Sequence, residues 1–232
     1  MPITVIFDGD DTLWEVQPIY DRAMDAFSRL LSREFEVSPE IIRDELLQID
    51  AAHVGKFGFG EQRFKHSMLT HYARFCVEQG RRESTEMKSK ISEMAATVST
   101  VFPKPMEGAQ EVLEDLYERH CLILYSGGTK TVQLQKLKNL GFERFFTAMY
   151  FCETKTAFDL KKILSEQHLV PELTWMVGNS PKSDINPALS LGLNCIWLKS
   201  AFWLYDEEPL SDRRVHQITS LRKIPGILSG KT

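Results

Sequence analysis

The chain has 232 residues, of which 43% are hydrophobic and 26% charged, a composition typical of a soluble globular protein. The formal net charge of −4 argues against a broad nucleic-acid-binding surface, and no apolar run approaches the ~20 residues that a membrane helix needs. Because the first strand leaves no room for a signal peptide and the four cysteines form no CxxC pair, we expect a cytoplasmic protein without a disulfide framework.

The amino-terminal segment carries the most informative pattern in the chain. Residues 3–7 form an apolar run that predicts a short buried strand, and acidic residues follow at positions 8, 10 and 11. While the chain stays extended, Asp8 and Asp10 point to the same side. Clustered carboxylates need a neutralising partner, and Mg²⁺ is the natural hard cation for oxygen ligands. The pattern indicates a nucleophile at Asp8 and a proton shuttle at Asp10, with Mg²⁺ between enzyme and phosphate.

A helical region follows from about residue 18 to residue 100, with no convincing strand. Helices are predicted over residues 40–53, 61–78 and 84–98, after a first helix that contains Tyr20, Met24 and Phe27. The helix over residues 40–53 is expected to end near Gly55, where a glycine-rich segment begins. We interpret residues 16–100 as a small all-helical domain inserted into a main domain of residues 1–15 and 101–232.

Strands and helices alternate from residue 101 onward. Strands are predicted over residues 121–125, 147–151, 173–177 and 194–198, with an edge strand over residues 215–218. Helices are predicted over residues 111–119, 132–140 and 158–167, and a short one leads to Gly192. Alternation of this kind predicts an α/β fold with a doubly wound, mostly parallel sheet and helices on both faces.

Four predicted strands are followed by polar residues suited to phosphoryl transfer. Ligands of an open α/β sheet bind beyond the carboxyl ends of the strands, so these residues are expected to meet in one site. A phosphoester is an anion, and Mg²⁺ together with an ammonium group would offset its repulsion of an attacking carboxylate. A serine hydroxyl and backbone N–H groups would donate to the phosphate oxygens. In chain order, the residues are Asp8 and Asp10, Ser126 and Gly127, Lys155, and Asn179 and Asp184.

Each of these residues has a simpler explanation when it is taken alone. Clustered aspartates often form a turn or a cap, and Ser-Gly-Gly after a strand is more often a turn than a phosphate site. Lys155 alone would be a solvated lysine, with Lys161 and Lys162 as rivals, and Asp184 would be a cap or first-turn acid of a helix. The coincidence of complementary groups at four strand ends favours the catalytic interpretation.

The sequence resembles the haloacid dehalogenase-like (HAD) hydrolase superfamily in four motifs. The motifs are Asp8-x-Asp10-x-Thr12-Leu13, Ser126 at the end of an apolar strand, Lys155, and residues 177–180 through Asp184. The resemblance covers the whole chain, because a helical insert between the first two motifs corresponds to the superfamily's cap.

The resemblance implies a role for each motif residue. Asp8 would be the nucleophile and Asp10 the acid and base. Mg²⁺ would be held by the Asp8 side chain, the Asp10 main-chain carbonyl and Asp184. The phosphate-binding set would consist of Ser126, Gly127, Lys155 and Asn179.

Two positions depart from the superfamily's usual pattern. Asp11 stands where glycine is commonest and adds negative charge near the site. Asn179 stands where an acid is frequent; an amide can still bind a metal-bound water, but one charge fewer should weaken Mg²⁺ binding.

The function that the sequence favours is a Mg²⁺-dependent phosphatase that acts on a small phosphorylated metabolite through an aspartyl-phosphate. Asp10 favours this over 2-haloacid dehalogenation, because cleavage of a carbon–halogen bond needs no protonated alkoxide leaving group. A phosphomutase would use the same core. A receiver-like phospho-acceptor domain is disfavoured, because its phosphorylated aspartate follows a later strand and it has no cap.

Substrate specificity is expected to come from the helical insert, which would close over the site as a lid. The glycine-rich segment with Phe57 and Phe59, and Lys56 or Arg63 near it, is the best candidate for substrate contacts. Trp14 is expected to line the entrance. Neither the individual substrate nor the oligomeric state follows from the sequence.

Overall fold

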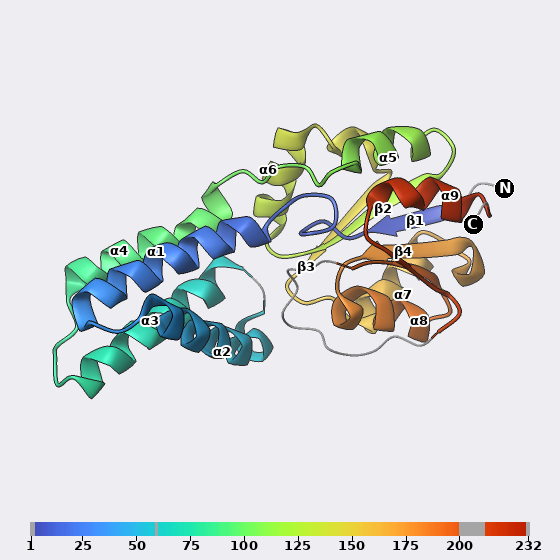
Figure 1. The fold of residues 1–232 in the computed structure, drawn as a ribbon. Coiled ribbons are helices and arrows are strands. Elements are labelled where there is room, and N and C mark those ends of the chain that lie inside the picture. The colour runs from blue at the N-terminus through green and yellow to red at the C-terminus, as the bar shows by residue number, and fades with distance from the viewer. Residues whose placement is uncertain (1–2, 59, 200–211, 231–232) are drawn as a thin grey trace. The chain divides into compact units, whose positions relative to one another are not determined.

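The computed structural model describes residues 3–58, 60–199 and 212–230. The chain divides into two compact units, one formed by Met1–Glu15 with Pro103–Thr232 and the other by Val16–Phe102. The first unit is an α/β domain, and the described residues of the second contain helices and no strand (Figure 1).

A six-stranded sheet forms the centre of the α/β unit, with strand order β3-β2-β1-β4-β5-β6. All of its strand pairs are parallel, which confirms the predicted fold class and replaces "mostly parallel" by wholly parallel for the described strands. The predicted edge strand is present as β6. The strands are β1 (Thr4–Phe7), β2 (Cys121–Gly127), β3 (Ala148–Cys152), β4 (Thr174–Gly178), β5 (Asn194–Leu198) and β6 (Val215–Ile218).

Helices cover both faces of this sheet, which explains why Val5, Ile6 and Phe7 of the central strand are fully buried. In Figure 1, α5 and α9 lie on one face, and α7 and α8 lie on the other. The helices of the unit are α5 (Ala109–Leu116), α6 (Lys130–Leu140), α7 (Ala157–Glu166), α8 (Asn186–Ser190) and α9 (Ile224–Leu228).

The strand order places a topological switch point between β1 and β4. The chain runs from β1 outward through β2 to β3, and then from β4 outward through β5 to β6. Where the order reverses, the connections leave the sheet on opposite faces and open a crevice at the carboxyl ends of the strands. The residues that follow β1 and β4 therefore border the part of the sheet where ligands bind in folds of this kind.

The described residues of the helical unit form four long helices, each of which buries one apolar stripe. Phe27, Leu31, Ile42, Phe64 and Met68 are completely buried in its core. In the described part of the chain, no helix has the length and apolar character needed to cross a membrane. The helices are α1 (Gln17–Phe35), α2 (Pro39–Phe57), α3 (Glu61–Glu78) and α4 (Thr85–Thr100).

The structure differs from the predicted helices at two places. Helix α2 does not end near Gly55 but continues to Phe57, and the residue that stops it is Gly58, which adopts a φ of 66°. Helix α9 was not predicted, because five residues are too few to show a helical period. Phe59 lies outside the described residues.

Gly55→Ala is expected to raise the free energy of unfolding by about 0.5–1 kcal/mol, because glycine lowers the stability of a helix interior relative to alanine. Gly55 is exposed, and no atom lies within 4 Å of an added Cβ. Urea denaturation measures the change. Gly58→Ala serves as the contrast and should be destabilising, because alanine is strained at a φ of 66°. A loss of stability in Gly55→Ala would contradict the prediction.

Candidate active site

Asp8 follows the end of β1 at the switch point, and its N–H donates to the Val177 carbonyl of β4 at 2.9 Å. The residue is only 4% exposed. One carboxylate oxygen contacts the Lys155 ammonium, and the other accepts a hydrogen bond from the Thr12 hydroxyl at 3.0 Å. Burial raises the pKa of the Asp8 carboxyl to about 7, and Lys155 beside it acts in the opposite direction. Asp8 is therefore shielded from solvent and paired with the Lys155 ammonium.

Lys155, which comes shortly after β3, joins two acidic residues. Its ammonium donates to one oxygen of Asp8 and to one oxygen of Asp184. Burial alone would lower the pKa of Lys155, but the carboxylates of Asp184 and Asp8 raise it above its ordinary value. Of the three lysines considered from the sequence, Lys155 is the one in the site, since Lys161 is exposed and Lys162 pairs with Glu166 at 3.6 Å.

Asp184 lies in a single π-helical turn, Pro181–Ile185, between β4 and α8. Its side chain is fully buried, and its second oxygen accepts the Ser180 N–H at 3.0 Å. Asp184 thus closes the turn, as the simpler interpretation supposed, and also pairs with Lys155 across the strand ends. Turns of the π type occur often at functional sites.

Gly178, the last residue of β4, leaves the space that Asp184 occupies. A Cβ atom at this position would lie 2.3 Å from Asp184 Oδ2. Gly178→Ala is therefore expected to displace Asp184 and to lower the free energy of unfolding by about 1–3 kcal/mol. Gly127→Ala is the matched control at the end of β2, where no atom lies within 4 Å of an added Cβ. Equal stability of the two variants in thermal denaturation would show that the space is not needed.

Asn179 and Thr12 form a second layer around Asp8. The Thr12 hydroxyl lies 3.3 Å from Asn179 Oδ1 as well as 3.0 Å from Asp8 Oδ2, so its single proton serves one of two acceptors. Asn179 is 3% exposed, and its Nδ2 has no partner among the described residues. This amide can donate to a water or phosphate oxygen. Thr12 is part of the first sequence motif, but no role was predicted for it.

Ser126 and Gly127 end β2 beside β1. Ser126 is completely buried, and its hydroxyl has one long contact, 3.4 Å to the Gly127 carbonyl. The absence of any atom within 4 Å of an added Cβ shows open space at Gly127. A hydroxyl with this freedom and an adjacent space suit an anion such as phosphate.

Asp10 lies in a different environment from Asp8. Among the described residues, no side chain forms a hydrogen bond or ion pair with both carboxylates. We use the name Asp10 cradle for Trp14, Gln133 and Lys136. Trp14 Nε1 donates to Asp10 at 2.5 Å, Gln133 Nε2 donates at 3.2 Å, and Lys136 Nζ lies 2.8 and 3.0 Å from the two oxygens. Neither Gln133 nor Lys136 was among the site residues predicted from the sequence.

A tight turn over residues 9–14 brings Trp14 back to Asp10. The strand ends at Phe7, the Leu13 N–H donates to the Gly9 carbonyl at 2.8 Å, and Asp11 adopts a φ of 56°. The chain thus reverses at Asp11, after both carboxylates. The positive φ also gives a physical reason for a glycine preference at position 11, and aspartate tolerates this conformation better than most residues.

The expectation that Trp14 lines the entrance is wrong. Trp14 is completely buried, and its indole packs against Gly9. A Cβ at Gly9 would lie 2.4 Å from the Trp14 ring and 2.8 Å from Ser126 Oγ. Glycine is thus required here because the indole and the strand end come close to the backbone.

Comparison with protein families matches residues 4–192 to the haloacid dehalogenase-like hydrolases. The chain belongs to this family. The match confirms the superfamily inferred from the four motifs, and it establishes the chain as a HAD-like hydrolase without fixing the bond that is cleaved. No sequence among the curated proteins matches the chain.

Solved structures share the fold of this HAD-like hydrolase. A haloacid dehalogenase-like family hydrolase from Xanthomonas campestris is 23% identical with a TM-score of 0.82, over 99% of this chain and 91% of that chain. The HAD-hydrolase YfnB from Bacillus subtilis, bound to magnesium, is 18% identical with a TM-score of 0.71, over 99% and 100%. The L-2-haloacid dehalogenase from Xanthobacter autotrophicus is 16% identical with a TM-score of 0.64, over 100% of both chains.

The donor set of the HAD-like hydrolase is compatible with Mg²⁺. Within the described residues no group of three or more His, Cys, Asp or Glu side chains is arranged to hold a metal ion. Asp8 and Asp184 nevertheless direct one oxygen each to the same ammonium, so two hard oxygen donors converge on a place that favours positive charge. Mg²⁺ is usually held by one or two carboxylates, with water and substrate oxygens completing its shell.

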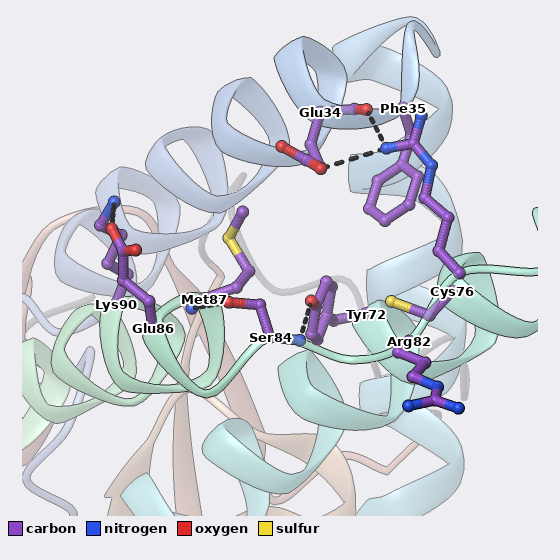
Figure 2. Close-up of a pocket in the computed structure, with 10 residues that line it drawn as sticks. Glu34, Phe35, Tyr72, Cys76, Arg82, Ser84, Glu86, Met87 and Lys90 are labelled. Atoms are coloured by element: carbon purple, nitrogen blue, oxygen red, sulfur yellow. Dashed lines mark hydrogen bonds and ion pairs between the residues drawn. The ribbon is translucent and has the colours of Figure 1, made fainter.

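A cavity of about 250 Å³ lies in the helical unit, where the end of α1, the end of α3 and the start of α4 meet (Figure 2). Two ion pairs occupy its rim: Arg81 lies 3.1 Å from Glu34, and Lys90 lies 2.7 Å from Glu86. None of the predicted site residues of the HAD-like hydrolase lines it. The cavity is therefore not the active site.

Proposed function

We propose that this HAD-like hydrolase is a Mg²⁺-dependent phosphatase of the cytoplasm that hydrolyses a small phosphorylated metabolite through an aspartyl-phosphate. The observation that supports the proposal is the pair of carboxylates in different environments. Asp8 is buried against Lys155 and Thr12, whereas the Asp10 side chain is 34% exposed and held by α6. Two carboxyl groups with different surroundings can take two different roles, here nucleophile and acid.

In the first step, a carboxylate oxygen of Asp8 attacks phosphorus, and the bond from phosphorus to the leaving oxygen breaks. Asp10 gives its proton to that oxygen. In the second step, a water oxygen attacks phosphorus and the bond to Asp8 breaks, while Asp10 takes the water proton. The products are an alcohol and inorganic phosphate.

The remaining site residues bind and orient the phosphate. The Lys155 ammonium would offset its charge, and the Ser126 hydroxyl, the backbone at Gly127 and the Asn179 amide would donate to its oxygens. Mg²⁺ held by Asp8, the Asp10 carbonyl and Asp184 would supply further charge neutralisation.

The structure gives different support to the residues of the helical unit that were predicted to contact substrate. Lys56 and Phe57 are exposed and lie close together, with the ammonium 5.1 Å from the ring centre, so both are retained in the proposal. Arg63 is 4% exposed and pairs with Asp50 at 2.8 Å, which accounts for it as a structural residue of the helical unit.

The test is an assay of p-nitrophenyl phosphate with Mg²⁺ and with a chelator, run beside 2-chloropropionate. We expect phosphate release that the chelator stops and added Mg²⁺ restores, and no release of chloride. Chloride release without phosphate release would instead establish a dehalogenase. Transfer of the phosphoryl group to a second hydroxyl, without free phosphate, would establish a mutase.

A further inference from the structure

The Asp10 cradle contains a buried cation that neither phosphate nor metal binding explains. The Lys136 side chain is 7% exposed, and its Nζ contacts both oxygens of Asp10. In the described part of the chain, no other acidic side chain lies within ion-pair distance of Lys136. Burial of an ammonium is unfavourable unless a charged partner compensates it, so the Lys136 ammonium favours the side-chain position of Asp10 that keeps the two groups in contact.

Gln133 connects the same carboxylate to the turn after β2. Its Nε2 donates to Asp10 at 3.2 Å and to the Gly127 carbonyl at 2.7 Å. Gln133 is 2% exposed, and a Cβ at Gly128 would lie 2.8 Å from its Nε2. Gln133 and Lys136 are three residues apart on α6 and therefore lie on one face of the helix.

We propose that Gln133 and Lys136 are positioning residues that hold the Asp10 carboxyl group, relative to the turn at Ser126 and Gly127, where it protonates the leaving oxygen. The inference rests on the proposed function, because it takes Asp10 as the acid. As the bond from phosphorus to the leaving oxygen breaks and the bond to Asp8 forms, the proton moves from Asp10 to the leaving oxygen. The Asp10 carboxylate that remains is paired with the Lys136 ammonium.

The dependence of kcat/KM on the leaving group distinguishes a positioning role of Gln133 and Lys136 from a merely structural one. Nitrophenolate leaves without a proton, whereas an alkoxide needs one. In Lys136→Met and Gln133→Leu, kcat/KM for an alkyl phosphate is expected to fall at least about 10-fold, and kcat/KM for p-nitrophenyl phosphate by less than about threefold. Lys138→Met and Gln135→Leu change exposed residues of the same helix and are expected to alter neither value.

The indole of Trp14 provides a second readout that does not depend on activity. Its Nε1–H donates to Asp10 at 2.5 Å, so its ¹H–¹⁵N resonance reports the position of the carboxylate. The chain has four tryptophans, and Trp14→Phe identifies the signal. We expect Lys136→Met to shift this resonance and the two control variants to leave it in place.

An equal loss for both esters, or an unshifted Trp14 resonance in folded Lys136→Met, would overturn the inference. If Lys136→Met does not fold, Gln133→Leu carries the same two expectations. If the parent protein hydrolyses no phosphate ester, the proposed function fails, and the Trp14 resonance still decides whether Lys136 holds Asp10.

Discussion

Asp8→Asn is expected to lower kcat for phosphate-ester hydrolysis by at least about 10⁴-fold, because removal of a catalytic nucleophile costs several orders of magnitude. Asparagine has nearly the shape of aspartate and retains an oxygen that can accept from Thr12 or Lys155, whose bonds now hold the carboxylate. The fold should therefore persist while the attacking group is lost. Steady-state kinetics and a thermal melt of the same preparation measure both effects.

Asp115→Asn is the matched control for this variant. Asp115 lies on α5, its side chain is 48% exposed, and its partner Arg119 is on the surface. We expect the control to keep the activity of the parent protein. Turnover by Asp8→Asn within about tenfold of the parent, in protein whose intact mass excludes deamidation back to aspartate, would remove Asp8 from the mechanism.

The second large effect concerns stability and lies in the helical unit. Arg63 and Asp50 form an ion pair in which both side chains are 4% exposed. Arg63→Met is expected to lower the free energy of unfolding at neutral pH by about 3–5 kcal/mol, because it leaves a buried carboxylate without its cation. Arg74→Met is the control, since Arg74 is 43% exposed where it pairs with Glu45, and should cost less than about 1 kcal/mol.

The cost of Arg63→Met should depend on pH. Burial raises the pKa of Asp50, and Arg63, the Ser67 hydroxyl and His53 act against this rise. Loss of Arg63 raises the Asp50 pKa further, so the folded state binds a proton more readily than the unfolded state does. Such a group stabilises the fold below its unfolded pKa, and the contribution is lost as pH rises through the folded pKa.

Denaturation of Arg63→Met in a pH series therefore should show a smaller deficit in acid than at neutral pH. The double variant Asp50→Asn with Arg63→Met should recover most of the loss, because no buried charge remains. A deficit that is constant with pH, or a double variant no more stable than Arg63→Met, would contradict the assigned cause.

The sheet and the meeting of Asp8, Lys155 and Asp184 could be predicted because the sequence signals for the strands and their ends are local. Apolar runs ended by polar residues mark the strands, and parallel topology then brings their carboxyl ends together. Lys155 and Asp184 thus meet Asp8, although the contacts span 147 residues from Asp8 to Lys155 and 29 from Lys155 to Asp184. No knowledge of side-chain positions was needed, since the strand order alone places these residues at one edge.

The Asp10 cradle could not be predicted, because nothing near Gln133 or Lys136 in the sequence distinguishes them from surface residues of a helix. Their partner is 123 and 126 residues away. Trp14 was assigned to the entrance because it follows the motif, but the turn at Gly9 carries its ring inward. The end of helix α2 was predicted at Gly55 because the sequence does not distinguish a glycine inside a helix from a glycine that ends one; the φ angle does.

If the protein uses Mg²⁺ as proposed, the double ion pair of Lys155 would make folding independent of metal binding. Asp8 and Asp184 would repel each other if nothing stood between them, and the protein supplies its own internal counter-ion for both. The polypeptide is therefore expected to fold without a divalent cation. Chelation should switch activity off without melting the protein, and addition of Mg²⁺ should switch it on again at the speed of ion binding rather than of folding.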